Sequence, residues 1–164
     1  MIFSVVILAL VTLERLSELW LSSRNTRRLL ARGAHEVGAA HYPLIVSVHV
    51  LWLAVLWWLA PERTVDGLWL TLYILLQLAR IWVMSTLGER WTARIIILPD
   101  APLVHRGPYR FVRHPNYLVV IGEIVVLPLV FGLWWVAALF SLLNAAVLTA
   151  RIREENAALS RLRD

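Results

Sequence analysis

The sequence contains no cysteine, and this absence excludes disulfide bonds, thiolate metal sites and cysteine nucleophiles. Its 164 residues leave no room for a soluble catalytic domain beside the hydrophobic segments, so we expect one domain. The N-terminus also lacks a basic segment and a small-residue cleavage site, which favours a retained segment beginning near Met1 over a removed signal peptide. Any active site must therefore be formed by the hydrophobic helices and their loops.

Charged residues are scarce, at 16% of the chain, whereas 60% of the residues are hydrophobic and the mean hydropathy is +0.69. Soluble domains are about 45–50% apolar, so the composition indicates an integral membrane protein. A membrane-spanning helix needs about 20 mostly apolar residues. Residues 2–21, 43–60 and 68–87 each meet that requirement, and the run 118–150 is too long for a single helix.

The long run carries Pro128 and Gly132 near its middle, followed by Trp134 and Trp135, which favour a membrane interface. These residues predict a tight helical hairpin, and hence an all-α protein with five membrane-spanning helices. Arginine-rich loops stay on the cytoplasmic side. We therefore expect the N-terminus outside and the C-terminus inside, with three arginine-rich segments in the cytoplasm. These are Arg24, Arg27, Arg28 and Arg32; Arg90, Arg94, Arg106, Arg110 and Arg113; and Arg151, Arg153, Arg161 and Arg163. This topology accounts for the net charge of +5 without nucleic-acid binding.

Ionisable residues inside the predicted spans are candidates for function, because a charge at a helix centre costs about 2.5–3.5 kcal/mol on insertion scales. Glu14 and Glu18 lie four apart on the first helix, beside Arg15. They fit a salt-bridge cluster near the interface equally well. For Arg80 and Glu123 we expect an interhelical ion pair that fixes packing, because an unpaired buried charge would be prohibitive.

The segment 107–117 is more polar than a membrane turn requires, and it includes Tyr109, His114 and Tyr117. Pro115 suits the first turn of the next helix. The hairpin brings the end of the last helix back to this loop, where Arg151 and Glu155 share one face. Aromatic rings, a carboxylate and cationic donors at a helix start suit a zwitterionic cofactor with an adenine ring, a ribose diol and a carboxylate.

These residues resemble a known family. The pattern Gly107-x-Tyr109-Arg-x-x-Arg113-His114-Pro115-x-Tyr117, a spanning hairpin and Arg151-x-x-x-Glu155 is similar to the isoprenylcysteine carboxyl methyltransferase and phospholipid methyltransferase superfamily. The N-terminal half resembles a bacterial branch, the alkylpyrone and alkylresorcinol O-methyltransferases, through Glu14-Arg15-Leu-x-Glu18, Ser23-Arg24-Asn25 and Gly38-x-x-His41-Tyr42-Pro43. Many superfamily members carry two adjacent glutamates at the end of the last helix, and here Asn156 stands at the second position.

The resemblance implies that S-adenosylmethionine binds from the cytoplasm and that a lipid enters sideways between the helices of a bacterial cytoplasmic membrane. It implies substrate-side helices over about 1–87 and a cofactor-binding loop and hairpin over about 88–164. The carboxylate that contacts the cofactor is placed on Glu155, with Glu154 as the alternative if the helix has a different register. The implied cofactor-binding residues are Tyr109, Arg113, His114, Pro115, Tyr117, Leu118, Glu154 and Glu155. No metal is implied.

The implied activity is O-methylation of a membrane-soluble lipid, with a phenolic or pyrone polyketide lipid as the leading substrate. His41, Glu18 and Glu14 are candidates for deprotonating a hydroxyl, and Arg24 and Arg151 for holding an anion. His41 also fits a plain residue ahead of the second helix. Alternatives are methylation of a prenylated carboxylate or a phospholipid amine, and a non-enzymatic membrane scaffold or small-molecule binder. The chain is too short for the nicotinamide-dependent sterol reductases whose C-terminal region looks distantly similar.

Overall fold

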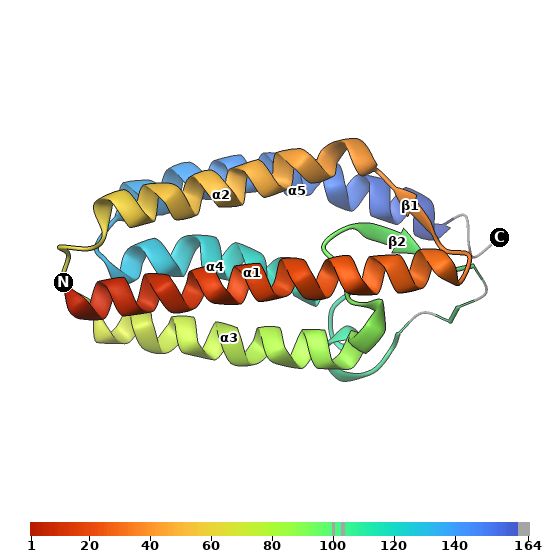
Figure 1. Cartoon of the computed structure of the whole chain (residues 1–164), viewed down its shortest axis with the longest axis horizontal. Coiled ribbons are helices and arrows are strands. Elements are labelled where there is room, and N and C mark those ends of the chain that lie inside the picture. The colour runs from red at the N-terminus through yellow and green to blue at the C-terminus, as the bar shows by residue number, and fades with distance from the viewer. Residues whose placement is uncertain (100, 103, 161–164) are drawn as a thin grey trace.

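A computed structural model describes residues 1–99, 101–102 and 104–160, and the side chains of residues 41 and 157–160 are not described. The described residues form five α-helices that run alongside one another (Figure 1). The helices are α1 (Ile2–Ala31), α2 (Tyr42–Leu59), α3 (Gly67–Leu87), α4 (Pro115–Val130) and α5 (Trp134–Ser160). The five predicted helices are therefore confirmed. The N-terminus and the end of α5 lie at opposite ends of the bundle (Figure 1).

The predicted hairpin is confirmed, because α4 ends at Val130 and α5 begins at Trp134. Gly132 makes the connection with a φ of 68°, a left-handed conformation that glycine adopts without the penalty of a Cβ atom. The NH of Leu133 donates to the carbonyl oxygen of Pro128 at 3.0 Å and closes the turn. Pro115 occupies the first turn of α4, where its missing NH costs no hydrogen bond.

The first helix is ten residues longer than the predicted span, since it continues through the arginine-rich segment to Ala31. Three helices are long and apolar enough to cross a membrane, namely α2, α3 and α5. Helix α4 is apolar but only 16 residues long, and α1 carries charged residues near its middle. The protein is an integral membrane protein, and the crossing of all five helices and their orientation stay predictions.

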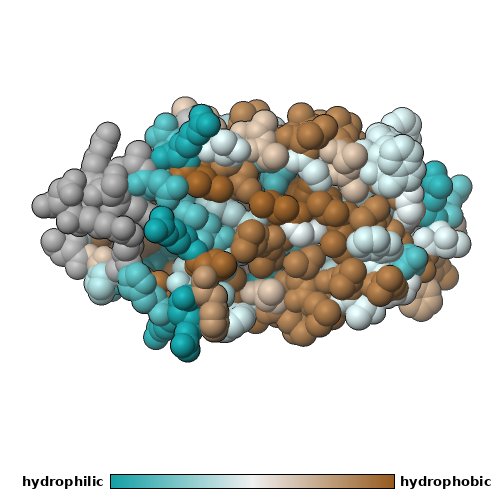
Figure 2. All heavy atoms as spheres, turned by 180° about the vertical axis from the view of Figure 1, so that it is seen from behind, coloured by the Kyte–Doolittle hydropathy of each residue, from teal (hydrophilic) through white to brown (hydrophobic). Residues whose placement is uncertain are grey.

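The surface of the bundle is apolar over its middle. Figure 2 shows a hydrophobic band between two more hydrophilic ends, with most of the hydrophilic residues near the end of α5. Leucine side chains in the middle parts of α1 and α3 are exposed, among them Leu10, Leu13, Leu75 and Leu78. Exposed side chains of this kind are expected where lipid tails, and not water, surround a helix.

The all-α prediction omitted a short β-ladder. Strand β1 (His35–Val37) pairs antiparallel with β2 (Ile95–Ile97), and Glu36 lies opposite Ile96. Both strands belong to loops at the end of the bundle where α1 and α3 finish (Figure 1). Three-residue strands carry too little periodic pattern to be recognised in a sequence. The ladder joins the loop after α1 to the loop after α3.

A buried ionic cluster joins α1, α3 and α4. The guanidinium of Arg80 contacts both carboxylate oxygens of Glu18 and donates from Nη1 to Oε2 of Glu123 at 2.9 Å. Arg15 donates to Oε1 of Glu123 at 3.0 Å and lies 3.1 Å from Oε2 of Glu18. Gln77 adds a hydrogen bond to Oε1 of Glu123 at 3.0 Å. The expected Arg80–Glu123 ion pair is confirmed, as is the salt-bridge contact among the charged residues of α1.

Removing Arg80 should destabilise the bundle strongly, because it would leave Glu18 and Glu123 without their main partner in an apolar interior. We expect Arg80→Met to cost about 3–5 kcal/mol of unfolding free energy, the usual range for breaking a buried ion pair. Adding Glu18→Gln and Glu123→Gln should recover part of this loss, because the uncompensated carboxylates are then gone. Thermal unfolding in detergent measures both effects, and equal midpoints for the parent, single and triple variants would contradict the assignment.

Candidate functional site

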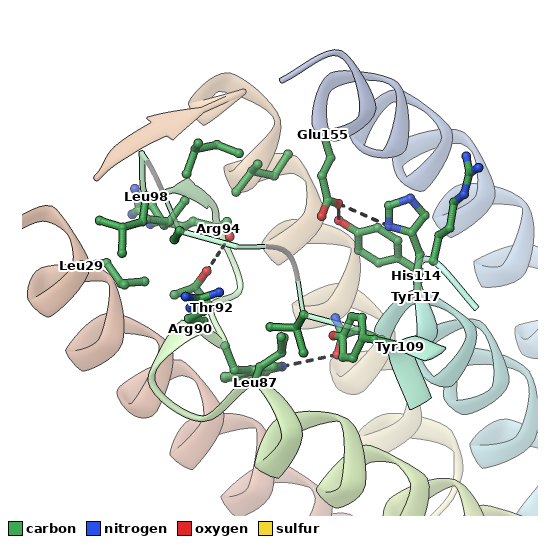
Figure 3. Close-up of a pocket in the computed structure, with 18 of the residues that line it drawn as sticks. Leu29, Leu87, Arg90, Thr92, Arg94, Leu98, Tyr109, His114, Tyr117 and Glu155 are labelled. Atoms are coloured by element: carbon green, nitrogen blue, oxygen red, sulfur yellow. Dashed lines mark hydrogen bonds and ion pairs between the residues drawn. The ribbon is translucent and has the colours of Figure 1, made fainter. Parts of the chain in front are cut away.

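A cavity of about 770 Å³ opens at the end of the bundle that carries the β-ladder (Figure 3). Its walls come from segments far apart in the sequence: the end of α1, the loop between α3 and α4, the start of α4 and the end of α5. The volume falls within the range of about 300–1,000 Å³ that is typical of small-molecule sites. Polar residues that line it include Arg90, Thr92, Arg94, His105, Tyr109, Arg113, His114, Asn116, Tyr117, Arg151, Glu155 and Asn156.

Tyr117 lies at the centre of a polar cluster between α4 and α5. Its hydroxyl donates to Oε2 of Glu155 and accepts a hydrogen bond from Nε of Arg151 at 2.8 Å. The ring of His114 stacks on the ring of Tyr117 with 5.4 Å between centroids. Tyr117 and Arg151 are both only 8% exposed. One phenol therefore links a cation and a carboxylate while its ring supports an imidazole.

His114 faces the end of α5 through both ring nitrogens. Its Nε2 lies 3.1 Å from Oδ1 of Asn156, and its Nδ1 lies 3.8 Å from Oε2 of Glu155. Asn156 is thus within hydrogen-bond distance of His114. It stands where many members of the superfamily that the sequence resembles have a second glutamate. Glu155 faces the cavity, whereas Glu154 is exposed and is not among its lining residues.

The loop before α4 is set by Gly107, whose φ is +56°. A Cβ atom at this position would lie 2.5 Å from Oγ1 of Thr86 on α3, so only glycine allows the close approach. The next residues form a short 3₁₀ helix, Gly107–Arg110, which carries Tyr109 into the cavity wall. Burial raises the pKa of the Tyr109 phenol, and the nearby Glu155 carboxylate raises it further. Tyr109 is therefore a neutral hydroxyl at physiological pH.

The opposite wall is the segment 91–98, and α1 holds it in place. Nδ2 of Asn25 donates to the carbonyl oxygen of Trp91 at 2.8 Å, and Oγ of Ser22 accepts from the NH of Ala93 at 2.8 Å. Nε1 of Trp91 reaches Oδ1 of Asn116 at 3.4 Å, which links this wall to the start of α4. The part of α1 that the sequence pattern did not predict as helix is thus the part that supports the cavity.

The structure brings most of the predicted cofactor-binding residues together and separates them from two of the predicted bases, Glu14 and Glu18. Leu118 faces outward with 55% exposure, and Pro115 lies at the start of α4 outside the lining. Glu14 and Glu18 belong to the ionic cluster and do not line the cavity. His41 lies in a short 3₁₀ helix, and its side chain is outside the described residues. Of the predicted site residues, Tyr109, Arg113, His114, Tyr117, Arg151 and Glu155 line the cavity.

Sequence reasoning missed the lining residues of the loop after α3. Arg90 and Arg94 were predicted only as part of an arginine-rich cytoplasmic segment, and Trp91 and Thr92 were given no role in a site. The run Ile95–Ile97 is β-branched, which favours a strand, but its partner lies about sixty residues earlier. The only local signal was a polar stretch directly after a predicted span.

Comparison with known proteins identifies the family to which the chain belongs. A sequence profile described as the isoprenylcysteine carboxyl methyltransferase (ICMT) family matches residues 69–161. The chain belongs to the ICMT family. The match covers the segments from α3 to α5 that carry the Tyr117 cluster, so the predicted superfamily is confirmed. As a member of this family, the chain is placed among membrane methyltransferases.

Two curated proteins resemble the ICMT-family chain over nearly its whole length. An uncharacterized protein of Bacillus subtilis, YpbQ, is 32% identical over 166 residues, which cover 93% of this chain and 94% of that protein. An uncharacterized protein of Haemophilus influenzae is 27% identical over 170 residues, which cover 99% of this chain and 98% of that protein. No solved structure matches the chain significantly.

Replacing Tyr117 by Phe should weaken the junction between α4 and α5, because Arg151 and Glu155 would lose the hydroxyl that links them. Hydrogen bonds to charged groups contribute about 1.5–3 kcal/mol each, so we expect a clear fall in the thermal midpoint. Tyr109→Phe is the matched control, since its hydroxyl makes no hydrogen bond to the described residues. If both variants unfold at the same temperature, the hydroxyl of Tyr117 does not serve as this link.

Proposed function

We propose that the protein is an S-adenosylmethionine-dependent O-methyltransferase that acts on a lipid dissolved in the membrane. The observation that carries this proposal is the cluster of His114, Tyr117, Arg151 and Glu155 on the wall of a cavity between α4 and α5. Its place within the region that matches a methyltransferase family supports the proposal.

The residues that line the cavity fit the methyl donor chemically. Stacked rings of His114 and Tyr117 offer an apolar face for an adenine ring. The Glu155 carboxylate can accept hydrogen bonds from a ribose diol or an ammonium group, and Arg113 can pair with a carboxylate. The bound donor supplies an electrophilic methyl group on a positively charged sulfur. Leu118 and Glu154 contribute at most through the backbone, because both are exposed and lie outside the cavity lining.

The chain contributes mainly by positioning the two reactants. Holding a methyl acceptor and a donor at near-attack distance in a site closed to water can supply about 7–11 kcal/mol of the barrier. The apolar side of the cavity, with Leu29, Leu87 and Leu98, suits the hydrocarbon of a lipid acceptor. We propose a phenolic or pyrone lipid as the acceptor, with a prenylated carboxylate as the alternative that the family description itself favours.

The candidates for a general base differ in their surroundings. Both carboxylate oxygens of Glu18 are occupied by Arg80, which supports a positioning role through the ionic cluster. Glu14 contacts Arg15 at 3.5 Å in the same cluster. His41 follows strand β1, whose partner β2 lines the cavity, and it stays our candidate for the base. Arg151 orients Tyr117 through its 2.8 Å hydrogen bond.

We further propose that residues 1–87 serve the lipid and residues 88–164 the donor, except that the segment 91–98 lines the part of the cavity that holds the acceptor. The concentration of arginines at the cavity end of the bundle supports a cytoplasmic site in a bacterial inner membrane, by the positive-inside rule. A non-enzymatic membrane binder is the alternative of another class. It is less well supported, because a membrane anchor does not require a cation and a carboxylate that are joined by one buried phenol.

Purified protein should transfer radiolabelled methyl from S-adenosylmethionine to lipid extracts or to synthetic alkylpyrones and alkylresorcinols. We expect His114→Ala and Glu155→Ala to lower this transfer by about tenfold or more, because each removes a group that faces the donor. Product separation and mass spectrometry then identify the methylated lipid.

Glu154→Ala is the control, because it removes an exposed carboxylate on the same helix turn that does not line the cavity. Thermal shifts with S-adenosylhomocysteine show whether each variant still binds the adenosyl group, since a ligand that binds only the folded state raises the midpoint. Absence of both a shift and a labelled lipid for the folded parent would favour the binder.

A further inference from the structure

We propose that Arg94, fixed by Glu36 and Tyr42, is the anion-binding residue of the acceptor end of the cavity, so that the methyl acceptor arrives with an ionised oxygen. This inference rests on the proposed function and deepens it by naming the acceptor's chemical class. It adds two residues, Glu36 and Arg94, that neither the sequence pattern nor the family match assigns to the site.

The cavity has two polar ends with different chemistry. Figure 3 shows Glu155, His114 and Tyr117 on one side, with Arg90, Thr92 and Arg94 on the other. The first side carries the aromatic faces and the carboxylate that suit the donor. The second side is cationic and lies beside Leu29 and Leu98 (Figure 3). A second reactant on this side would therefore meet positive charge and apolar side chains together.

Arg94 is held in a defined position by β1 and by the start of α2. Its Nη1 lies 3.0 Å and 2.9 Å from the two carboxylate oxygens of Glu36, which is on the partner strand of the ladder. Its guanidinium carbon lies 4.4 Å from the centre of the Tyr42 ring, a cation–π contact. A planar guanidinium fixed in this way is preorganised to bind a carboxylate or another oxyanion.

The side chain of Arg94 keeps donor capacity for a ligand. It is 40% exposed, and the hydrogen bonds that it makes to the described residues use Nη1. A guanidinium has five NH donors, so those on Nη2 and Nε are available to the cavity that Arg94 lines. Arg90, the neighbouring cation, donates to the carbonyl oxygen of Pro102 at 2.6 Å, which compensates none of its charge.

The charge balance of the cavity also favours an anionic acceptor. Among the described residues, the lining arginines Arg90, Arg94, Arg113 and Arg151 are opposed by two carboxylates, Glu155 in the lining and Glu36 beside Arg94. The donor brings a positive sulfonium into the same space. Like charges in a site of low dielectric repel strongly, so a neutral or cationic acceptor would leave this charge uncompensated. An anionic acceptor offsets it, whereas a phospholipid amine would add to it.

An ionised acceptor also removes the need for a base at the moment of transfer. The acceptor oxygen supplies the electron pair for the new carbon–oxygen bond, the bond between the methyl carbon and sulfur breaks, and sulfur keeps that electron pair. One negative and one positive charge disappear, and no proton moves. Carboxylates and the acidic enols of hydroxypyrones are ionised near neutral pH, whereas a simple phenol with a pKa near 10 is not.

The apolar residues beside Arg94 favour an anion that also carries a hydrocarbon chain. Ile95 and Ile97 follow it on β2 and are both buried, and Leu29 and Leu98 complete this side of the cavity. The acceptor class that fits is therefore a hydrocarbon chain that ends in an oxyanion. Two sources share this chemistry, an alkylated hydroxypyrone and a prenylated carboxylate, and the experiment includes both.

The test compares each anionic probe with its own neutral methylated form. The pairs are a 4-hydroxy-6-alkyl-2-pyrone with its methyl ether, and N-acetyl-S-farnesylcysteine with its methyl ester. We expect at least one anionic probe to raise the thermal midpoint of the full-length protein more than its neutral partner does. Arg94→Gln should abolish this difference and weaken binding of the anion by about tenfold to hundredfold, the loss expected for a charge-assisted hydrogen bond.

Arg28→Gln is the matched control, since it breaks another Arg–Glu pair, 2.9 Å from Glu89, that does not line the cavity. The charge-swapped variant with Glu36→Arg and Arg94→Glu separates a structural pair from an anion site. Either role predicts that this variant recovers stability, because the ion pair is restored. Only the anion site predicts that the variant still binds the anionic probe no better than its neutral form. In a turnover assay with the better probe, Arg94→Gln should raise KM for the acceptor much more than it lowers kcat.

Two results would overturn the inference: a parent that does not distinguish either anion from its neutral form, or an Arg94→Gln variant that still does. Binding of S-adenosylhomocysteine separates this failure from failure of the proposed function. If S-adenosylhomocysteine binds the parent and Arg94→Gln equally, and the parent prefers neither anion over its neutral form, only the inference is wrong. If S-adenosylhomocysteine does not bind the parent, the proposed function itself fails.

Discussion

The buried guanidinium of Arg80 is the constraint around which the bundle is arranged. A charge inside a membrane protein has no bulk water to solvate it, so its partners must come from neighbouring helices. Glu18 from α1 and Glu123 from α4 supply them, and Arg15 and Gln77 saturate the same carboxylates. These hydrogen bonds and ion pairs join specific atoms of α1, α3 and α4, so they form in one register of the helices. They fix α1 relative to the α3–α4 pair, and the cavity depends on that placement.

Two separate sets of hydrogen bonds, here called tethers, hold the walls of the cavity at the end of the bundle. The α4–α5 hairpin returns Arg151 and Glu155 to the start of α4, where Tyr117 joins them. On the other side, α1 extends beyond its apolar portion and holds the 91–98 wall through Asn25 and Ser22. The first tether belongs wholly to the region shared with the ICMT family, and the second requires the N-terminal half. The two sides of the cavity are therefore positioned by different parts of one short chain.

The helices and the side of the cavity formed by α4 and α5 could be predicted from the sequence, because their signals are local. Apolar runs of spanning length, Pro128 and Gly132 at the turn, and the spacing of Arg151 and Glu155 on one helix face all act within a few residues. The side of the cavity formed by residues 91–98 could not be predicted. Strands β1 and β2 are three residues long, and the partners Glu36 and Arg94 are brought together only by the fold. Likewise, Asn25 on α1 looks like an ordinary helix residue until the loop after α3 meets it.

The β-ladder has a consequence for how such proteins can diversify. Glu36 and Arg94 lie in different halves of the chain, yet their contact spans the boundary of the region that the family profile covers. A change of charge at position 94 leaves Glu36 without its cation, and in the proposed anion site it would also alter what the cavity accepts. Substitutions at the two positions are therefore expected to be coupled. Chimaeras that exchange the N-terminal helices between relatives carry the same coupling across the junction.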